Sequence, residues 1–397
     1  MPHVVLGVSG GIAAYKAAEV LRRFTESGHD VRVIPTEGAL HFVGAATWAG
    51  LSGHPVHDDV WSGADQVEHV RVGQQADLVV VAPATADLLA RAATGRADDL
   101  LTATLLTARC PVMFAPAMHT EMWEHPATRA NVATLRERGA VVVEPAVGRL
   151  TGPDTGKGRL PDPGEIFAVA ARLLARGPAE PDLVGRHVVV TAGGTREYLD
   201  PVRFLGNSSS GKQGYAFART AVARGARVTL VAANTVLADP AGVEVVRVVS
   251  TEDLRAAVLA AANGADAVVM AAAPADFRPA EYARSKIKKS EGDAGMTVNL
   301  VRNPDVAAEL GGARRPGQVL VAFAAETDNA ITNARVKLDR KRADLIVVNE
   351  VGRDRTFGAD RNAATVLGAD GSTTVIPECA KDELADAVWD MVVARLG

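Results

Sequence analysis

Residues 3–34 read HVVLGVSGGIAAYKAAEVLRRFTESGHDVRVI, and this stretch decides the fold. Residues 3–8 are rich in Val and Leu, as in a buried strand, and residues 31–34 repeat that composition. Between them, residues 12–27 place apolar side chains at helical spacing. Because a strand, a helix and a second strand in this order make the β-α-β unit of a parallel sheet, the sequence predicts an α/β fold.

The same pattern recurs in the second half of the chain. Residues 186–191 and 227–232 have the composition of strands, with a helix predicted over 212–224 between them. A length of 397 residues exceeds the roughly 250–300 that one core supports, so we expect two doubly wound, Rossmann-like domains. The segment GPAEPDLVG at 177–185 has the Pro and Gly residues of a linker. The predicted domains are therefore residues 1–176 and 186–397. Further Val-rich strands are expected at 78–82, 111–115, 141–143, 243–248, 267–271, 319–323 and 345–348.

Composition limits the classes of partner. The formal net charge is −4, from 43 Lys and Arg against 47 Asp and Glu, and no basic face indicates nucleic acid. The two cysteines, Cys110 and Cys379, lack the spacing of a disulfide framework or a zinc site. The N-terminus lacks the pattern of a signal peptide, and the apolar runs fall short of the roughly 20 residues of a membrane-spanning helix. We therefore expect a cytoplasmic protein that binds neither membranes nor nucleic acid.

Three predicted strands of the first half are followed by segments suited to a ligand. Residues 7–16, GVSGGIAAYK, join a strand to a helix, where free backbone N–H groups favour a phosphate. The motif is not GxGxxG, and Thr36 follows the second strand where a nicotinamide site needs an acidic residue, so a flavin-like mononucleotide fits better. Segments 82–87 (APATAD) and 115–123 (APAMHTEMW) follow two further strands. A tight strand-to-helix turn without a ligand is the alternative for the glycine segment alone.

Together VSGGIAAYK, APATADL and PAM-x-x-x-MW resemble the flavin-dependent cysteine decarboxylase family over about the first 175 residues. The resemblance implies that FMN binds between the subunits of a trimer, oxidises the thiol of the substrate to a thioaldehyde and returns hydride after CO₂ departs. It also implies a catalytic role for His69, which precedes the APATA strand, although a lone histidine is more often structural. The FMN-binding positions implied here are Ser9, Gly10, Gly11, Thr36, Ala84, Thr85 and Met118.

Two positions depart from the motifs of that family. His119 stands where the family has an Asn that holds the substrate carboxylate, and Thr151 stands where its flap segment has a cysteine. Threonine is a far weaker acid than cysteine, so the usual proton donor is missing. We hypothesise that His119 both binds the carboxylate and supplies the proton.

Two segments of the second half indicate a nucleotide. Residues 206–213, GNSSSGKQ, approach a P-loop, but Gln213 replaces the Ser or Thr that binds magnesium and the preceding strand ends too early. A kinase or ATPase is therefore disfavoured. In residues 271–289, Asp276 precedes a lysine cluster that includes Lys286. A carboxylate can bind a ribose or base edge and ammonium groups can neutralise phosphates, so this segment suits a nucleoside triphosphate.

The run TAGGTREYLDPVRFLGNSSSGKQGYA, followed by AAAPADFRPA, KIKK, NPDV, FAAET and KLDRKRADLIVVN, resembles phosphopantothenate–cysteine ligase over about residues 186–365. The resemblance implies a CTP-binding ligase domain, with Mg²⁺ accompanying the nucleotide on metal ligands that stay unassigned. Asn207 corresponds to the residue that acts on the acyl intermediate; the alternative is a helix-capping asparagine. The implied CTP contacts are Asp276, Lys286, Asn303, Pro304, Asp305, Phe323, Lys337 and Lys341.

The two resemblances together imply a bifunctional enzyme of coenzyme A biosynthesis. The second domain would join phosphopantothenate to cysteine with CTP, and the first would decarboxylate phosphopantothenoylcysteine to phosphopantetheine. The alternatives are a flavoprotein oxidoreductase with a nucleotide-regulated second domain, and a flavin-binding regulatory scaffold without activity. Family resemblance also implies a homo-oligomer of trimeric first domains and dimeric second domains, possibly a dodecamer.

Overall fold

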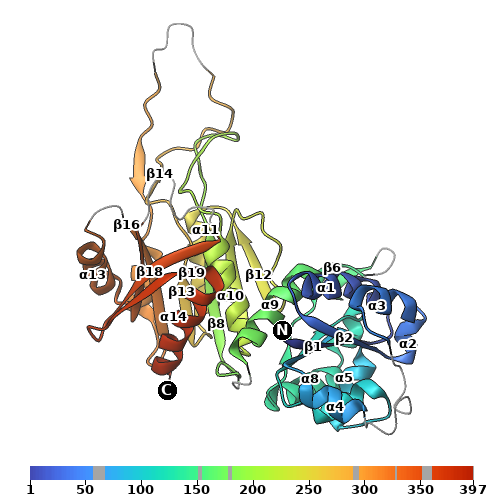
Figure 1. The fold of residues 1–397 in the computed structure, drawn as a ribbon. Helices are drawn as coiled ribbons and strands as arrows, with labels where there is room; N and C mark the ends of the chain where they lie inside the picture. Colours follow the sequence, from blue (N-terminus) through green and yellow to red (C-terminus); the bar gives the residue numbers. More distant parts are fainter. Residues whose placement is uncertain are drawn as a thin grey trace. The chain divides into compact units, whose positions relative to one another are not determined.

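The computed structural model describes residues 1–56, 68–150, 154–177, 181–288, 295–326, 329–350 and 360–396. The chain forms two compact units (Figure 1). The first comprises Met1–Gly185, Arg219–Arg227 and Ala238–Val243, and the second comprises Arg186–Ala218, Val228–Leu237 and Glu244–Gly397. Within the described ranges, no helix combines the length and the apolar character needed to cross a membrane.

The first unit is built on a parallel sheet in the order β2-β1-β3-β4-β5. Its strands are β1 (His3–Val8), β2 (Asp30–Pro35), β3 (Leu78–Ala84), β4 (Val112–Pro116) and β5 (Val141–Val142). Every residue of β3 is buried, as expected of a parallel strand that is covered on both faces. The strand order reverses between β1 and β3, and ligands of doubly wound sheets bind beyond the strand ends at such a reversal.

Helices cover both faces of this sheet. They are α1 (Ala14–Glu26), α2 (Glu37–Leu40), α3 (Ala45–Ser52), α4 (Glu68–Gln75), α5 (Ala86–Thr94), α6 (Leu100–Thr107), α7 (Thr120–Glu124), α8 (Pro126–Glu137) and α9 (Pro163–Arg176). The Phe24 ring of α1 meets the Phe167 ring of α9, with 5.0 Å between centroids. A separate core holds Leu88, Leu101 and Leu135 of α5, α6 and α8. The hairpin of β6 (Ala146–Arg149) and β7 (Thr155–Arg159) was not foreseen from the sequence.

The second unit contains a larger sheet, whose described strands follow the order β12-β11-β8-β13-β16-β17-β18-β19. They are β8 (His187–Gly193), β11 (Arg227–Ala233), β12 (Val243–Val248), β13 (Ala267–Met270), β16 (Val319–Glu326), β17 (Leu345–Glu350), β18 (Arg361–Gly368) and β19 (Thr373–Ala380). The first six have the Rossmann order, which reverses between β8 and β13. The prediction of doubly wound α/β domains is confirmed, whereas the antiparallel pairing of β17, β18 and β19 was not foreseen.

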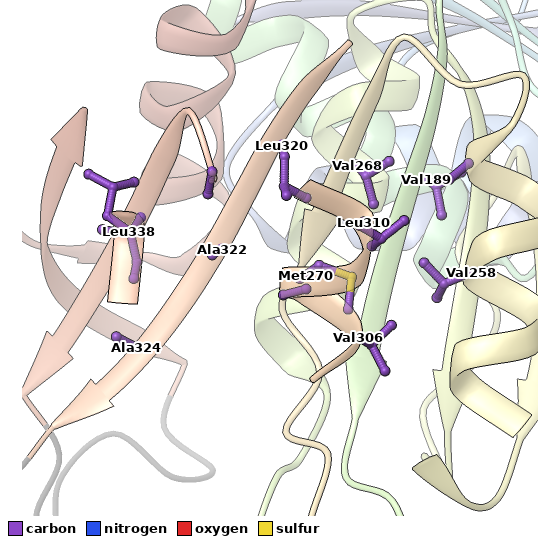
Figure 2. Packing of buried hydrophobic residues seen from close by; sticks show 14 of the residues in the cluster. Val189, Val258, Val268, Met270, Val306, Leu310, Leu320, Ala322, Ala324 and Leu338 are labelled. Atoms are coloured by element: carbon purple, nitrogen blue, oxygen red, sulfur yellow. The ribbon is translucent and has the colours of Figure 1, made fainter. Parts of the chain in front are cut away.

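Helices cover both faces of this sheet, and the contacts of alternating residues of β16 show which helices pack on which face. The helices are α10 (Lys212–Ala223), α11 (Thr251–Ala262), α12 (Val306–Ala313), α13 (Ala330–Lys341) and α14 (Lys381–Leu396). Ala322 and Ala324 share a core with Leu338 of α13 and with side chains of α11 and α12 (Figure 2). Phe323 belongs to the other face, because successive residues of a strand point to opposite sides. There it meets Phe217 of α10 with ring centroids 5.6 Å apart, and Phe217 meets a tryptophan of α14.

Two short antiparallel pairs extend from this sheet. They are β9 (Glu197–Tyr198) with β10 (Phe204–Leu205), and β14 (Phe277–Pro279) with β15 (Leu300–Arg302). Residues 280–288 run outward from β14 (Figure 1). Asp200 holds this segment, because its Oδ2 accepts from the backbone N–H of Ile287 at 3.2 Å. Arg203 contacts both Asp200 and this segment, because its guanidinium donates to the Asp200 carboxylate and to the carbonyl of Ile287.

The Asp200 contacts predict a loss of stability in acid. Burial raises the pKa of Asp200, but hydrogen bonds from the backbone of Val202, Arg203 and Ile287 outweigh it and hold the pKa below its usual range. Because the folded pKa is lowered, this stabilisation is present above the unfolded value of about 3.9 and is lost as pH falls through the folded pKa. We expect Asp200→Asn to lower the melting temperature at pH 7 and to flatten its fall below about pH 4.

Melting curves of both proteins between pH 7 and pH 3 check this expectation. Exposed Glu281, on the same segment, supplies the control variant Glu281→Gln, which should follow the wild type. Equal acid sensitivity of Asp200→Asn and the wild type would contradict the role given to this carboxylate.

Candidate functional site

In the first unit, the ends of β1, β2 and β3 are joined by hydrogen bonds. Ser9 is 1% exposed, and its Oγ donates to the carbonyl of Pro83 at 2.7 Å and accepts from the backbone N–H of Thr85 at 2.9 Å. The backbone N–H of Thr36 donates to the carbonyl of Val8 at 2.9 Å. The predicted FMN positions after these three strands are thus brought together at the reversal of strand order.

The glycine turn between β1 and α1 leads into a helix N-terminus that no side chain caps. The N-cap of α1 is Ala13, whose methyl side chain cannot accept a hydrogen bond from the first N–H groups of the helix. A Cβ on Gly10 would lie 2.8 Å from the carbonyl carbon of Gly38, so this position accepts only glycine without a shift of the backbone. Because uncapped helix N-termini favour phosphates, the residues of this turn fit the phosphate of FMN.

Gly10→Ala should therefore remove bound flavin. The added methyl group meets the rigid backbone of Gly38, and overpacking of this kind costs about 1–3 kcal/mol. We expect loss of the visible flavin absorbance of the purified protein and a lower melting temperature of the first unit. Gly50→Ala is the matched control, because its Cβ meets no atom within 4 Å and alanine favours helix α3. A fully yellow Gly10→Ala protein would show that this close approach is not needed.

The segment after β4 lies against the end of β3 and against the β6–β7 hairpin. The backbone N–H of Ala117 donates to the carbonyl of Ala84 at 3.1 Å, and that of Met118 donates to the carbonyl of Gly158 at 2.9 Å. His119 follows directly as the N-cap of α7, where its exposed side chain makes no capping bond. Met118 and His119 therefore sit beside the residues that follow β3.

His69 lies on α4, apart from the hydrogen bonds of the glycine turn. Its carbonyl accepts from Thr107 Oγ1 at 2.8 Å, which fixes the start of the helix. Its Nδ1 is buried and has no hydrogen-bond partner among the described residues. Within these ranges no hydrogen bond joins His69 to Ser9 or Thr85. Thr151, the other predicted catalytic position, lies outside the described residues.

The second unit contains a cavity of about 390 Å³ at the ends of β13 and β16, which is also lined by the segment that leads into α10. Most of the predicted ligase positions line it: Asn207, Asp276, Asn303, Pro304, Asp305, Phe323, Lys337 and Lys341. Lys286 is not among the lining residues; it lies exposed on the segment that runs outward from β14. The structure thus brings together residues from segments that are far apart in the sequence, but not Lys286.

Asn207 contacts the loop after β13. Its Nδ2 donates to the carbonyl of Pro274 at 2.8 Å. A Cβ on Gly194 would lie 2.4 Å from the carbonyl oxygen of Asn207, so the loop that carries Asn207 packs directly against the backbone of Gly194. Because α10 begins at Lys212, five residues later, Asn207 is not the helix cap that the alternative interpretation required.

A charged network occupies the side of the cavity formed by α12 and α13. Lys341 Nζ lies 2.6 Å from Asp305 Oδ1, and Arg340 lies 3.4 Å from Oδ2. Burial raises the pKa of Asp305, but the Lys341 contact more than offsets it and holds the pKa below its usual range. The Nδ2 of Asn303 donates to the carbonyl of Ala275 at 2.8 Å, so this amide links the loops after β13 and β15.

Sequence reasoning missed several polar residues of the cavity, which are Lys212, Arg340, Asn349, Asn362 and Lys381. Three of them lie inside motifs quoted above, so their segments were recognised without a role for the individual side chain. Asn362 and Lys381 belong to β18 and α14, elements whose sequence carries no recognised motif. Among the described residues no group of three His, Cys, Asp or Glu side chains could hold a metal ion.

Comparisons with known proteins cover both halves of the chain. Residues 1–175 match the family model described as Flavoprotein, and residues 183–396 match that of the DNA/pantothenate metabolism flavoprotein C-terminal domain. The coenzyme A biosynthesis bifunctional protein CoaBC of Mycolicibacterium smegmatis is 59% identical over 99% of this chain and 98% of its own length. The Bacillus subtilis protein of the same name is 42% identical over 99% of this chain and 97% of its own.

A crystal structure of the C-terminal domain of a CoaBC protein is 35% identical, covers 55% of this chain and 98% of its own, and has a TM-score of 0.47. The family assignment depends on the sequence relatives and on the two family models, which together match both units. They give no support to the oxidoreductase alternative. With both units matched and the relatives aligned from end to end, the chain belongs to the CoaBC family of bifunctional coenzyme A biosynthesis proteins.

Proposed function

We propose how the two activities of this bifunctional enzyme are divided along the chain. Residues 186–397 form a ligase domain that joins 4′-phosphopantothenate to cysteine through an acyl cytidylate. Residues 1–176 form a domain that decarboxylates the product to 4′-phosphopantetheine, and residues 177–185 link them. The observation that carries the proposal is the cavity of the second unit, which gathers Asn207, Asp276 and the α13 lysines.

In the ligase domain, the substrate carboxylate attacks the α-phosphorus of CTP and pyrophosphate leaves. Lys337 and Lys341 stabilise the negative charge on the phosphates, with Mg²⁺ arriving alongside the triphosphate. Asp276 binds the ribose or base edge and Phe323 contacts the nucleotide. The amine of cysteine then attacks the acyl carbon, CMP leaves, and Asn207 orients the reacting groups.

The residues on this side of the cavity have different proposed roles in binding the nucleotide. In the absence of nucleotide, Asp305 neutralises Lys341, and the ammonium group can exchange this carboxylate for a phosphate when CTP arrives. Asn303 already uses its amide to hold Ala275 and accepts from Arg278 at 3.0 Å, so we assign it the positioning of the loop before Asp276. Lys286 keeps a proposed phosphate contact, made from a segment outside the lining of this cavity.

In the decarboxylase domain, the glycine turn and the ends of β2 and β3 hold FMN. When bound, FMN supplies the two-electron redox chemistry that makes loss of CO₂ possible. The glycine turn and the uncapped N-terminus of α1 would hold the phosphate end, Ser9 would fix this turn against the end of β3, and Met118 would contact the flavin. His69 moves a proton or holds the substrate carboxylate. His119 binds that carboxylate and supplies a proton, in place of the cysteine that Thr151 replaces.

We further propose a cytoplasmic homo-oligomer, with the first domains joined as trimers and the second as dimers. Exposed apolar side chains beside the glycine turn support the first contact, because Ile12 is 69% and Tyr15 60% exposed. Large apolar groups exposed next to a binding site are typical of an interface. Native mass measurements of the full chain test this assembly.

A coupled assay tests the proposed function. Purified protein is given 4′-phosphopantothenate, cysteine and either CTP or ATP, and pyrophosphate and CO₂ are measured together with the visible spectrum. We expect a flavin spectrum, nucleotide-dependent pyrophosphate release and CO₂ release that requires cysteine. A colourless protein that releases neither product would overturn the proposal.

A further inference from the structure

A buried carboxylate, that of Glu197 on β9, lies behind the loop that carries Asp276. Glu197 is 5% exposed and does not line the cavity. Its Oε1 accepts from Thr251, the first residue of α11, through the backbone N–H at 2.9 Å and through Oγ1 at 2.8 Å. Removing a carboxylate from water is costly, whereas a helix N-terminus stabilises it, so the start of α11 holds Glu197 against Thr251.

The hydroxyl of Thr251 connects this carboxylate to the loop after β13. Thr251 Oγ1 lies 3.0 Å from Thr195 Oγ1 and accepts from Asn303 Nδ2 at 3.3 Å. Thr195 Oγ1 accepts from the backbone N–H of Ala275 at 2.9 Å, and Asn303 Nδ2 also donates to the carbonyl of Ala275 at 2.8 Å. Both backbone polar groups of the residue before Asp276 are therefore held by side chains that contact Thr251.

Asn303 also holds the backbone of Asp276 itself. The backbone N–H of Asn303 donates to the carbonyl of Asp276 at 2.9 Å. Ala275, Asp276 and Asn303 all line the cavity. The place of the Asp276 carboxylate, the proposed ribose or base contact, thus depends on Asn303 keeping its position and orientation.

The donors and acceptors along this series of contacts permit one orientation of the Asn303 amide. A carboxylate only accepts hydrogen bonds and a hydroxyl has a single hydrogen, so the Thr251 hydroxyl donates to Glu197. Thr251 Oγ1 can then only accept from its other neighbours, which requires Asn303 to turn Nδ2 toward it. Without an acceptor on residue 197, the hydroxyl could donate to Oδ1 of Asn303 instead, and the amide could turn over.

The orientation of Asn303 decides what its side chain can offer a ligand. Both hydrogens of Nδ2 are used by Thr251 and Ala275, so Oδ1 is the atom of this amide that can bind a nucleobase. Oδ1 accepts from Arg278 at 3.0 Å, and an amide oxygen has a second lone pair. That lone pair suits the amino group of cytosine and is mismatched with the carbonyl oxygen that uracil carries at the same position.

We propose that Glu197 is a positioning residue of the ligase, which sets the Asn303 amide through Thr251 and makes the site selective for a nucleobase with an amino group. This inference rests on the proposed ligase function and deepens it. Loss of the contact between Glu197 and Thr251 would weaken nucleotide binding. The reaction of bound CTP would continue, because Asn207 and the α13 lysines stay in place.

Thr251→Val in the full-length protein tests this role. Valine keeps the branched shape of threonine and the backbone N–H that donates to Glu197, but it lacks the hydroxyl. We expect the KM for CTP in pyrophosphate release to rise about 10-fold, as for one lost hydrogen bond, and kcat to change less than about 2-fold. The ratio of kcat/KM for CTP to that for UTP should fall about 10-fold. A purely structural role would lower the melting temperature and leave the KM for CTP and this ratio unchanged.

Two further variants complete the experiment. Thr229→Val makes the same change at a buried threonine of β11, whose Oγ1 lies 3.0 Å from His187 Nε2 and outside the cavity lining, so it should keep the wild-type KM. Glu197→Gln preserves the shape of the side chain and decides the outcome if Thr251→Val does not fold. Its amide is a weaker acceptor and can also offer a donor to Thr251, so we expect the KM for CTP to rise about 3-fold.

An unchanged KM for CTP in these two variants, or a fall in kcat with the KM and the CTP-to-UTP ratio unchanged, would refute the inference. A wild-type protein that uses UTP as well as CTP would also refute it. Failure of the wild type to release pyrophosphate from any nucleotide would instead refute the ligase function.

Discussion

Asn207→Asp is expected to stop amide formation while pyrophosphate release continues. The side chain of Asn207 lines the cavity and its Nδ2 donates to the carbonyl of Pro274. Aspartate has no donor, so it loses this bond and brings a negative charge toward the acyl cytidylate. Removal of one positioned donor typically costs about 10²- to 10³-fold in rate, and we expect a loss of this size in the second half-reaction.

Single-turnover assays with labelled CTP separate the two half-reactions of the ligase. The acyl cytidylate should accumulate in Asn207→Asp, because activation of the carboxylate does not need this amide. Asn263→Asp makes the same chemical change at the exposed C-cap of α11 and should leave both steps intact. If Asn207→Asp instead loses CTP binding, the residue holds the loop in place and does not act on the intermediate.

His69→Asn is expected to abolish decarboxylation and to leave ligation intact. The buried Nδ1 of His69 has no partner in the described part of the chain, so the ring is not committed to a structural hydrogen bond there. Loss of a group that transfers a proton in the rate-determining step usually costs about 10²- to 10⁴-fold, which sets the expected fall in CO₂ release. Pyrophosphate release should persist, because the described residues that line the ligase cavity all belong to the second unit.

Retention of flavin distinguishes catalysis from folding in this variant. His69→Asn should keep the visible spectrum of the wild type, since the glycine turn does not involve this residue. His125→Asn is the control, because His125 caps α8 through its side chain and asparagine also caps helices well. A colourless His69→Asn protein, or one with normal CO₂ release, would contradict a catalytic role.

Most strands and the β-α-β units were predictable because their signals are local. The buried strands β1, β3 and β8 are runs of Val, and α1 shows its apolar spacing within 13 residues. Local patterns of this kind do not describe the antiparallel edge of the larger sheet. The strand β19 exposes most of its residues, so its sequence lacks the apolar composition of the central strands.

The residues of the candidate sites likewise fall into those that local motifs predicted and those that they did not. Motif order placed Asn207, Asp276 and the α13 lysines in one ligase site, and these residues line one cavity. The motif KIKK also implied Lys286, but no local pattern states how far a segment after β14 extends from the sheet. The sequence likewise gave no signal for Lys381, which reaches the cavity only because α14 packs against Phe217.

By itself, the sequence determined the α/β class, the two doubly wound halves and the family, because each depends on short-range periodicity or on motifs read in order. Tertiary structure alone decided that Asn207 binds the carbonyl of Pro274, 67 residues away, and that Lys381 lies beside the residues which follow β8. Such contacts depend on how helices pack on the two faces of a sheet. That packing is set by the sum of many weak side-chain contacts between distant segments, and no single stretch of sequence contains it.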